Sequence, residues 1–386
     1  MIETTNTVTT RLGHLLGVRR LDAALLSVAQ DRGQSGVGPP HSKETPNRSV
    51  LMVLVAVLCL TSCGGGIQNS INPAGPQAGN LSRLWWLMFT VCSVVFVIVM
   101  IALLLSLRNR TRESVAELTP QVELPHEQER RRRNVVISAA SVTVIVLFVF
   151  LIASFSAGRS MTAELANKNG LAIEVTGHQW WWEVRYSDVD ASNIFTTANE
   201  IHIPVGVPVT FTLHGGDVIH SFWVPNLAGK KDLIPGKVNT IWLQADKPGV
   251  FRGQCAEYCG LQHAQMALWV VAEPQEQFNA WRQNQTQTSV PPANDSQKRG
   301  QQVFLSSTCV MCHAINGTPA GSNIGPNLTH VGSRNTIAAA TMSNTRDHLA
   351  QWIKDSQQVK PGNKMPQQNL SDADLQSLID YLQSLR

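Results

Sequence analysis

Residues 253–266 read Gly-Gln-Cys-Ala-Glu-Tyr-Cys-Gly-Leu-Gln-His-Ala-Gln-Met, which places two thiols, an imidazole and a thioether within twelve positions. Cys255, Cys259, His263 and Met266 follow the spacing C-x3-C-x3-H-x2-M. Thiolate and thioether groups are soft ligands that favour copper, and imidazole also suits copper. Structural zinc sites instead use closed sets of four strong ligands, mostly Cys and His. Because a Met stands in the fourth position here, the stretch predicts a copper site.

A second imidazole, His220, lies upstream in residues 217–223, an alternating run that is typical of a β-strand. Two thiolates and two imidazoles are more than one small copper site needs. The most economical arrangement is a pair of copper ions bridged by both sulfurs, each ion with one His and one weak axial ligand. The alternative is a pair of reduced cysteines in an ordinary loop, but the specific spacing favours the metal site.

These residues resemble the binuclear copper-A centre of cytochrome c oxidase subunit II. The resemblance implies that two copper ions are bound by the backbone carbonyl of Glu257 and by five side chains, those of His220, Cys255, Cys259, His263 and Met266. It further implies that the Glu257 side chain helps to bind a magnesium ion at the interface with subunit I.

The N-terminal part predicts export. Residues 1–49 are polar and carry no motif, and the short apolar run 50–62 suits the core of a signal peptide better than a spanning helix. The run ends in Leu-Thr-Ser-Cys, which resembles a bacterial lipobox and predicts that Cys63 is acylated and begins the mature chain. A buried or uncleaved anchor is the alternative. Residues 64–83, rich in Gly, Asn, Ser and Pro, predict a flexible tether.

Two uncharged stretches of 24 residues, 84–107 and 135–158, predict a transmembrane helical hairpin over residues 84–158. As a helix each would be about 36 Å long, enough to cross a hydrocarbon core of about 30 Å. Trp85 and Trp86 stand where an interfacial aromatic belt is expected.

The segment between the spans, 108–134, holds seven arginines, which predicts that it lies in the cytoplasm. Both ends of the hairpin then face outward from a bacterial cytoplasmic membrane, in agreement with an acylated Cys63. The formal net charge of +4, without another basic cluster, argues against nucleic acid as a partner.

Residues 159–273 contain short alternating segments separated by Gly and Pro, which predicts an antiparallel β-sandwich; examples are 171–176, 207–213, 240–243 and 267–271. The resemblance narrows this to a cupredoxin-like Greek key with the copper loop at one end.

The stretch 177–183, Gly-His-Gln-Trp-Trp-Trp-Glu, is similar to the aromatic stretch of the same family. By that resemblance Trp180 is the residue through which electrons enter near the copper centre. Aromatic residues that only pack a core or rest against the membrane are the alternative. Three other histidines lack a partner motif and are predicted to be structural; they are His178, His202 and His214.

After a predicted linker, 274–293, a new domain covers residues 294–386. Cys309-Val-Met-Cys312-His313 is the C-x-x-C-H haem c attachment motif, in which two thioethers hold the haem and the His is its proximal ligand. His/Met ligation is the cytochrome c arrangement. This arrangement favours Met365, which lies in an exposed turn, as the sixth ligand of the haem iron. Met342, in a stretch that looks helical, is the second candidate, and Met311 lies within the attachment loop.

A helix capped by Ser371 is predicted to follow, with an apolar face of leucines and one isoleucine along residues 375–385. It resembles the terminal helix of an all-α class I cytochrome c, which packs on an N-terminal helix that would here carry Gly300 and Phe304. Residues 325–328, Gly-Pro-Asn-Leu, match the loop that such domains place beneath the haem.

The whole pattern resembles subunit II of a cytochrome c oxidase with a fused cytochrome c, over residues 80–386. This implies electron transfer from haem c through copper-A to subunit I, where O2 is reduced to water with proton pumping. The implied partners are subunit I, other oxidase subunits, membrane lipid, and an external cytochrome c or a quinol–cytochrome c reductase as donor. The two spans contain no histidine, so the O2-reducing site belongs to another chain.

Three other classes are alternatives. A quinol oxidase subunit lacks the copper ligands, nitrous oxide reductase needs a large propeller domain, and a free-standing tethered shuttle would act without subunit I. Charge favours docking between the two metal domains. Residues 170–273 carry ten Asp and Glu against six Lys and Arg, whereas residues 294–386 carry six against eight.

Overall fold

The computed structural model describes residues 66–108, 126–162 and 171–386. The predicted signal segment and Cys63 lie outside the described residues.

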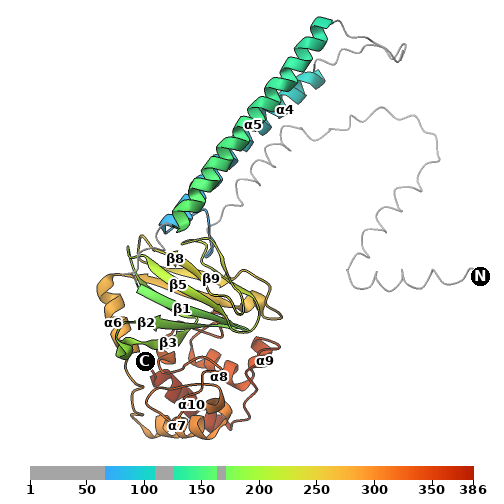
Figure 1. The fold of residues 1–386 in the computed structure, drawn as a ribbon. Coiled ribbons are helices and arrows are strands. Elements are labelled where there is room, and N and C mark those ends of the chain that lie inside the picture. The colour runs from blue at the N-terminus through green and yellow to red at the C-terminus, as the bar shows by residue number, and fades with distance from the viewer. Residues whose placement is uncertain (1–65, 109–125, 163–170) are drawn as a thin grey trace, which may run out of the picture. The chain divides into compact units, whose positions relative to one another are not determined.

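Two long helices, α4 (Pro76–Arg108) and α5 (His126–Thr162), run side by side (Figure 1). The most apolar window of each helix has a mean hydropathy of 3.0, and none of it is buried in the protein. An apolar surface of this extent is unfavourable in water, so both helices are suited to lipid. The two apolar helices expected from the sequence are present.

The residues just before α4 and its first turn pack against the sandwich, although their composition favours a flexible tether. The amide of Ala74 donates to the carbonyl of Asn226, and the Gln77 side chain is buried and donates to the carbonyl of Trp242. Polar side chains that predict flexibility here make specific hydrogen bonds instead.

Ten strands form a β-sandwich of two five-stranded sheets. One sheet has the order β3-β2-β1-β5-β8 and the other the order β4-β10-β9-β6-β7. The strands are β1 (Leu171–His178), β2 (Trp181–Ser187), β3 (Phe195–Ala198), β4 (Glu200–Pro204), β5 (Val209–Gly215), β6 (His220–Trp223), β7 (Lys231–Leu233), β8 (Asn239–Leu243), β9 (Gly249–Cys255) and β10 (Ala267–Glu273).

Alternating side chains of the two sheets fill the core between them, as the sequence pattern predicts. On β1 the buried residues include Ile173 and Val175, and on β2 Trp182, Val184 and Tyr186 are fully buried. Most neighbouring strands are antiparallel, but β1 with β5 and β10 with β4 are parallel. Such pairs arise where the chain crosses between sheets, which alternation in sequence cannot reveal.

Helix α6 (Gln275–Gln285) lies within the predicted linker and packs on the sandwich. Phe278 is buried, and the Trp281 ring stacks on His202 with 4.0 Å between the ring centroids. Residues 286–293 then connect α6 to the next helix.

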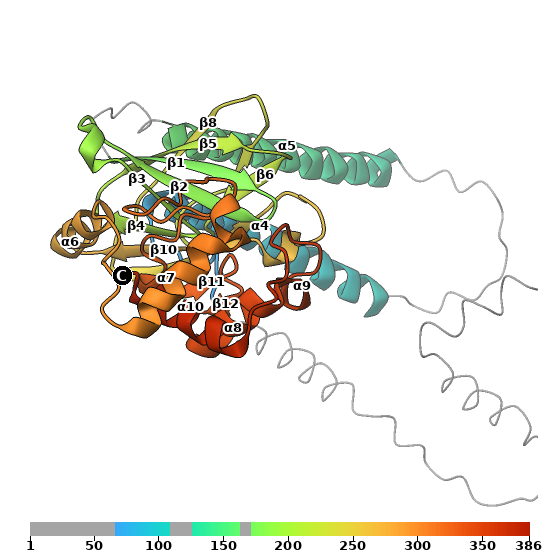
Figure 2. The ribbon, with the colours of Figure 1, turned by 90° about the horizontal axis from the view of Figure 1, so that it is seen from below.

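The C-terminal domain is helical (Figure 2). Its helices are α7 (Asp295–Ser306), α8 (Arg346–Lys354), α9 (Ser356–Val359) and α10 (Asp372–Ser384). Helices α7 and α10 cross at Gly300, where an added Cβ would lie 2.0 Å from the carbonyl oxygen of Ser377. Phe304 and Tyr381 are buried in the same contact. Ser371 caps α10 by accepting the amide of Asp374, as predicted.

The expectation of a helix around Met342 is wrong. Two short strands, β11 (Thr336–Ile337) and β12 (Met342–Ser343), pair there instead. Between them, residues 338–340 are three alanines with φ of 54–58°, in the left-handed region. Alanine has a high helix propensity, so the sequence pattern misleads at this position.

Candidate metal centres

The copper-type cluster lies where three chain segments meet at one end of the sandwich. His220 is the first residue of β6, Cys255 is the last of β9, and β10 begins directly after Met266. The register pairs Phe222 with Cys255, and the Cys255 amide donates to the Met266 carbonyl at 2.9 Å. Strand pairing thus fixes the base of the loop 256–265 and holds its side chains over the sheet end.

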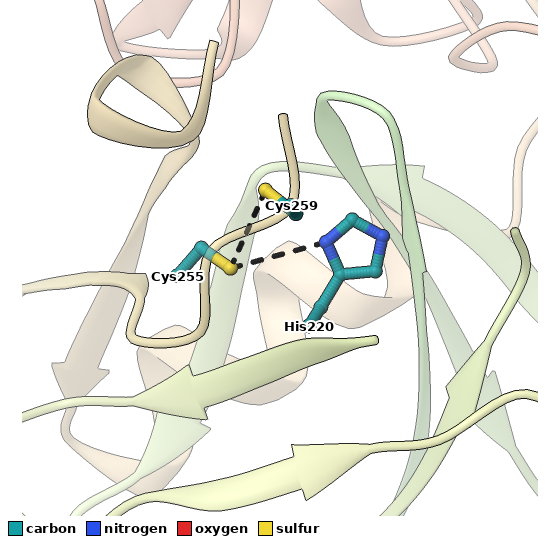
Figure 3. A group of neighbouring side chains, drawn as sticks. All are labelled: His220, Cys255 and Cys259. Carbon is teal, nitrogen blue, oxygen red and sulfur yellow. Dashed lines mark hydrogen bonds between the residues drawn. The ribbon is translucent and has the colours of Figure 1, made fainter. Parts of the chain in front are cut away.

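The two sulfurs and the first imidazole approach one another closely (Figure 3). Cys255 Sγ lies 3.8 Å from both Cys259 Sγ and His220 Nδ1. All three side chains are buried, and their potential ligand atoms lie within 4.8 Å of one another. In the described part of the chain, this is the one such group of three or more His, Cys, Asp or Glu.

The remaining predicted ligands adjoin the same sulfurs. His263 Nδ1 lies 3.6 Å and Met266 Sδ 3.8 Å from Cys259 Sγ, and the carbonyl oxygen of Glu257 lies 3.2 Å from Cys255 Sγ. The structure therefore brings together two thiols, two imidazoles, a thioether and a carbonyl. Soft donors in this number fit a pair of copper ions better than one zinc ion.

The two thiols differ in acidity. The hydrogen bond from Cys259, ahead of the opposing effect of burial, and the contact with His220 lower the pKa of Cys255 to about 3. The bond to Cys255, together with burial, raises the pKa of Cys259. Copper would bind both sulfurs as thiolates, because metals bind the deprotonated form.

Asp217 is a residue of the site that sequence reasoning missed. Its Oδ1 lies 2.9 Å from His220 Nε2, so the other ring nitrogen is directed at Cys255. Its Oδ2 accepts the backbone amide of Gln179 at 2.7 Å. Carboxylates commonly orient metal-binding imidazoles in this way. The spacing Asp-x-x-His was the available signal.

Trp180 lies directly against the copper loop. Its indole Nε1–H donates to the Cys259 carbonyl at 3.0 Å, and Gln179 Nε2 donates to the same oxygen at 2.8 Å. Gly260 has a φ of +113°, and an added Cβ would lie 3.0 Å from the Trp180 ring. Glycine is thus required here both for the backbone conformation and for the close approach of the ring.

The Glu257 carboxylate has a lysine as its partner. It is 3.8 Å from the ammonium of Lys230, and both side chains are about half exposed. A cation as partner gives no support to a magnesium site at this carboxylate.

In the C-terminal domain, the attachment motif spans the short helix η4 (Thr308–Met311) and the residues after it. His313 Nδ1 lies 2.7 Å from the carbonyl oxygen of Pro326, within the loop predicted to lie beneath the haem. Burial lowers the pKa of His313 and so favours the neutral ring that binds iron. With Nδ1 donating to Pro326, the other nitrogen, Nε2, is the one available to a metal.

Met365 is held by its backbone. Its carbonyl accepts from Ser356 Oγ at 2.6 Å and from Gln357 Nε2 at 3.0 Å, and its amide donates to Asn363 Oδ1 at 2.8 Å. Met342, by contrast, packs against the apolar core of the domain. This difference favours Met365 over Met342 as the methionine that would bind the haem iron.

Comparisons with known proteins match both domains that carry the candidate sites. The family described as "Cytochrome C oxidase subunit II, periplasmic domain" matches residues 190–273, and the cytochrome c family matches residues 297–386. The cytochrome c oxidase subunit 2 of Alkalihalophilus pseudofirmus is 37% identical over 85% of this chain and 94% of its own. That of Bacillus sp. strain PS3 is 33% identical over 62% and 68%, and that of Bacillus subtilis 26% over 88% and 98%.

Proposed function

This chain belongs to the cytochrome c oxidase subunit II family, and we propose that it passes electrons from a C-terminal haem c to copper-A and on to subunit I. The observation that carries the proposal is the convergence of His220, Cys255 and Cys259 beside His263 and Met266. Bound there, copper supplies one-electron redox chemistry. Cys309, Cys312, His313 and Met365 would hold the haem; these complete the proposed ligand set.

Protein residues prepare the copper site for rapid electron transfer. Buried sulfurs exclude water, and strand pairing at Cys255 and the Asp217 contact to His220 hold donor positions that need little rearrangement. Ligands that move little favour fast electron transfer, because the bound metal would change its charge while keeping the same ligands.

Trp180 is the proposed point at which electrons reach the sandwich. Its indole donates a hydrogen bond to the carbonyl of Cys259, one of the residues that would hold the copper. This contact gives a short route from the domain surface to the cluster.

We further propose that α4 and α5 both cross a bacterial cytoplasmic membrane, with the arginines at 130–133 inside and both metal domains outside. Subunit I, which reduces O2 and couples that reaction to proton pumping, would then lie in the same membrane. Acylation of Cys63 would add a lipid anchor on the outer face.

The purified oxidase tests the electron path. After flash reduction of haem c, copper-A absorbance should fall without added cytochrome c, because the arriving electron would convert the coloured oxidised pair to colourless Cu(I). Trp180→Phe, which removes the donor to Cys259, should slow this step, whereas Trp181→Phe should not, because Trp181 stacks on His178 instead. A need for soluble cytochrome c would refute the built-in donor, and an unchanged rate in Trp180→Phe would refute only the role of this residue.

A further inference from the structure

Lys360 is a buried lysine between the two metal domains. Only 2% of its surface is exposed, and its ammonium donates to three backbone carbonyls. Two belong to the sandwich, Trp180 at 3.1 Å and Gln265 at 2.9 Å, and the third, Ala338 at 3.3 Å, belongs to the cytochrome domain. One side chain thus ties both domains together.

Burying the ammonium of Lys360 costs free energy, because the group loses its hydration. Such burial therefore requires specific partners. Burial lowers the pKa of Lys360 to about 7. An ammonium removed from water is tolerated when hydrogen bonds replace its hydration, and three carbonyls match its three donors. The site is accordingly a built socket and not a chance surface contact.

The socket lies on the copper loop. The Trp180 indole is bonded to the carbonyl of the proposed ligand Cys259, and Gln265 directly precedes the proposed ligand Met266. Lys360 therefore bonds to the backbone of Trp180, which contacts Cys259, and of Gln265, which lies between His263 and Met266, but to no proposed copper ligand.

The three left-handed alanines, 338–340, provide an independent observation. Alanine rarely adopts positive φ, and such conformations persist where the surroundings impose them. Here the carbonyl of Ala339 accepts the amide of Ala267, the first residue of β10, and the carbonyl of Ala338 accepts Lys360. The turn at 338–340 is thus held in its strained conformation by hydrogen bonds to the sandwich and to Lys360.

The segment that carries Lys360 also leads to the proposed haem ligand. Gln262 Nε2 donates to the carbonyl of Pro361 at 2.6 Å, and the Lys364 ammonium lies 3.4 Å from Asp217. Met365 follows directly. One short segment, 360–365, thus connects the copper loop to the expected sixth ligand of the haem.

We propose that Lys360 is a positioning residue that docks the cytochrome c domain on the Trp180 side of the copper loop and so sets the separation for electron transfer between the domains. This inference rests on the proposed function and specifies how its two centres are held together.

The first test uses Lys360→Met in the intact oxidase. Methionine keeps much of the apolar volume and removes all three donors. We expect normal haem c and copper-A spectra but a transfer rate lowered at least about tenfold, in proportion to the lost docked fraction. The enhanced spin relaxation that oxidised haem imposes on copper-A in electron paramagnetic resonance should weaken in parallel.

Lys354→Met is the matched control, because Lys354 is an exposed lysine at the end of α8 in the same domain. It should behave as the wild type in both measurements. An unchanged rate and relaxation in Lys360→Met would overturn the role of Lys360. Absence of internal transfer in the wild type would instead refute the proposed function.

A second measurement needs no variant. Acetic anhydride labels accessible amines. In the intact oxidase at about pH 8, where an exposed lysine reacts through its small neutral fraction, Lys354 should be acetylated while Lys360 is protected by burial, as peptide mass spectrometry would show. Labelling of Lys360 as extensive as that of Lys354 would overturn the docked socket even if Lys360→Met failed to assemble.

Discussion

The copper loop and the haem domain differ in how much of each metal site the polypeptide builds alone. At the copper loop, sulfur and nitrogen donors already lie 3.6–3.8 Å apart in the folded chain. In the haem domain, His313 and Met365 come from separate loops and are each held by backbone contacts of their own. The proposed copper donors thus contact one another, whereas the proposed haem ligands are each held separately.

The difference follows from where each site stands. Two proposed copper donors, His220 and Cys255, sit on paired strands, and the loop that carries the others is fixed at its ends by β9 and β10 of a sandwich whose core includes Cys255, Cys259 and Met266. In the haem domain the proposed ligands lie on loops instead, and the proposed haem would lie between them. A site on rigid strands is preorganised by the fold, and a site between loops is completed by its ligand.

The largest expected effect is on the copper side. Cys259→Ser removes the sulfur that contacts three other proposed donors, those of Cys255, His263 and Met266. We expect complete loss of the binuclear centre, measured as copper content and absorbance, with haem c still attached. Cys92→Ser, in the exposed surface of α4, should retain both metals. If the Cys259 variant still bound two copper ions, the loop would not need its paired sulfurs, and the preorganisation described for the copper site would be wrong.

On the haem side, the largest effect should come from packing. Gly300→Ala places a methyl group 2.0 Å from the Ser377 carbonyl, so α7 and α10 must separate. We expect a loss of stability of about 1–3 kcal/mol or more in this domain, typical of overpacking. The loss should appear as faster hydrogen exchange in α10, with unchanged copper-A absorbance. Exchange that stayed slow would show that the haem and not this crossing holds the domain together.

A smaller effect distinguishes the two candidate methionines. Met365→Leu should abolish methionine ligation and lower the haem reduction potential, because a thioether ligand favours reduced iron. Met342→Leu replaces a core residue by one of similar volume and should cost less than about 1.5 kcal/mol, without a change of ligation. Optical and redox titration of the two variants would decide between them, and the opposite result would assign the ligand to Met342.

Sequence patterns predicted what depends on local spacing. Alternation gave the strands, and the Cys-x3-Cys-x3-His loop selected residues that the fold does bring together with His220. The helix cap at Ser371 also follows from residues near in sequence, whereas the crossing at Gly300 joins distant segments and was implied only by the resemblance to class I cytochromes c.

Features that depend on partners distant in sequence were missed. The Phe278 and Trp281 side chains give α6 only a weak apolar face, so a packed helix was taken for part of a linker. The alanines at 338–340 favour a helix until contact with the sandwich imposes a turn. Lys360 has no local signal at all, because its carbonyl partners stand up to 180 residues away.

The smallest expected effect concerns the stability of the sandwich itself, which should depend on His202 separately from copper. His202 lies 3.2 Å from Glu200 and 2.9 Å from Glu273, and its ring is stacked on Trp281. Burial disfavours its protonation, but the hydrogen bonds and charges of both carboxylates outweigh burial and raise the pKa of His202. A group whose pKa is raised on folding stabilises the fold fully below its unfolded pKa, about 6.5, and loses this contribution as pH rises through the folded value. We therefore expect thermal loss of copper-A absorbance to occur at lower temperature as pH increases above about 6.5. His202→Gln should flatten this dependence, and His214→Gln, on β5, should leave it as in the wild type. If His202→Gln retained the full pH dependence, the stabilising proton would belong elsewhere, and the copper cluster itself would become the candidate.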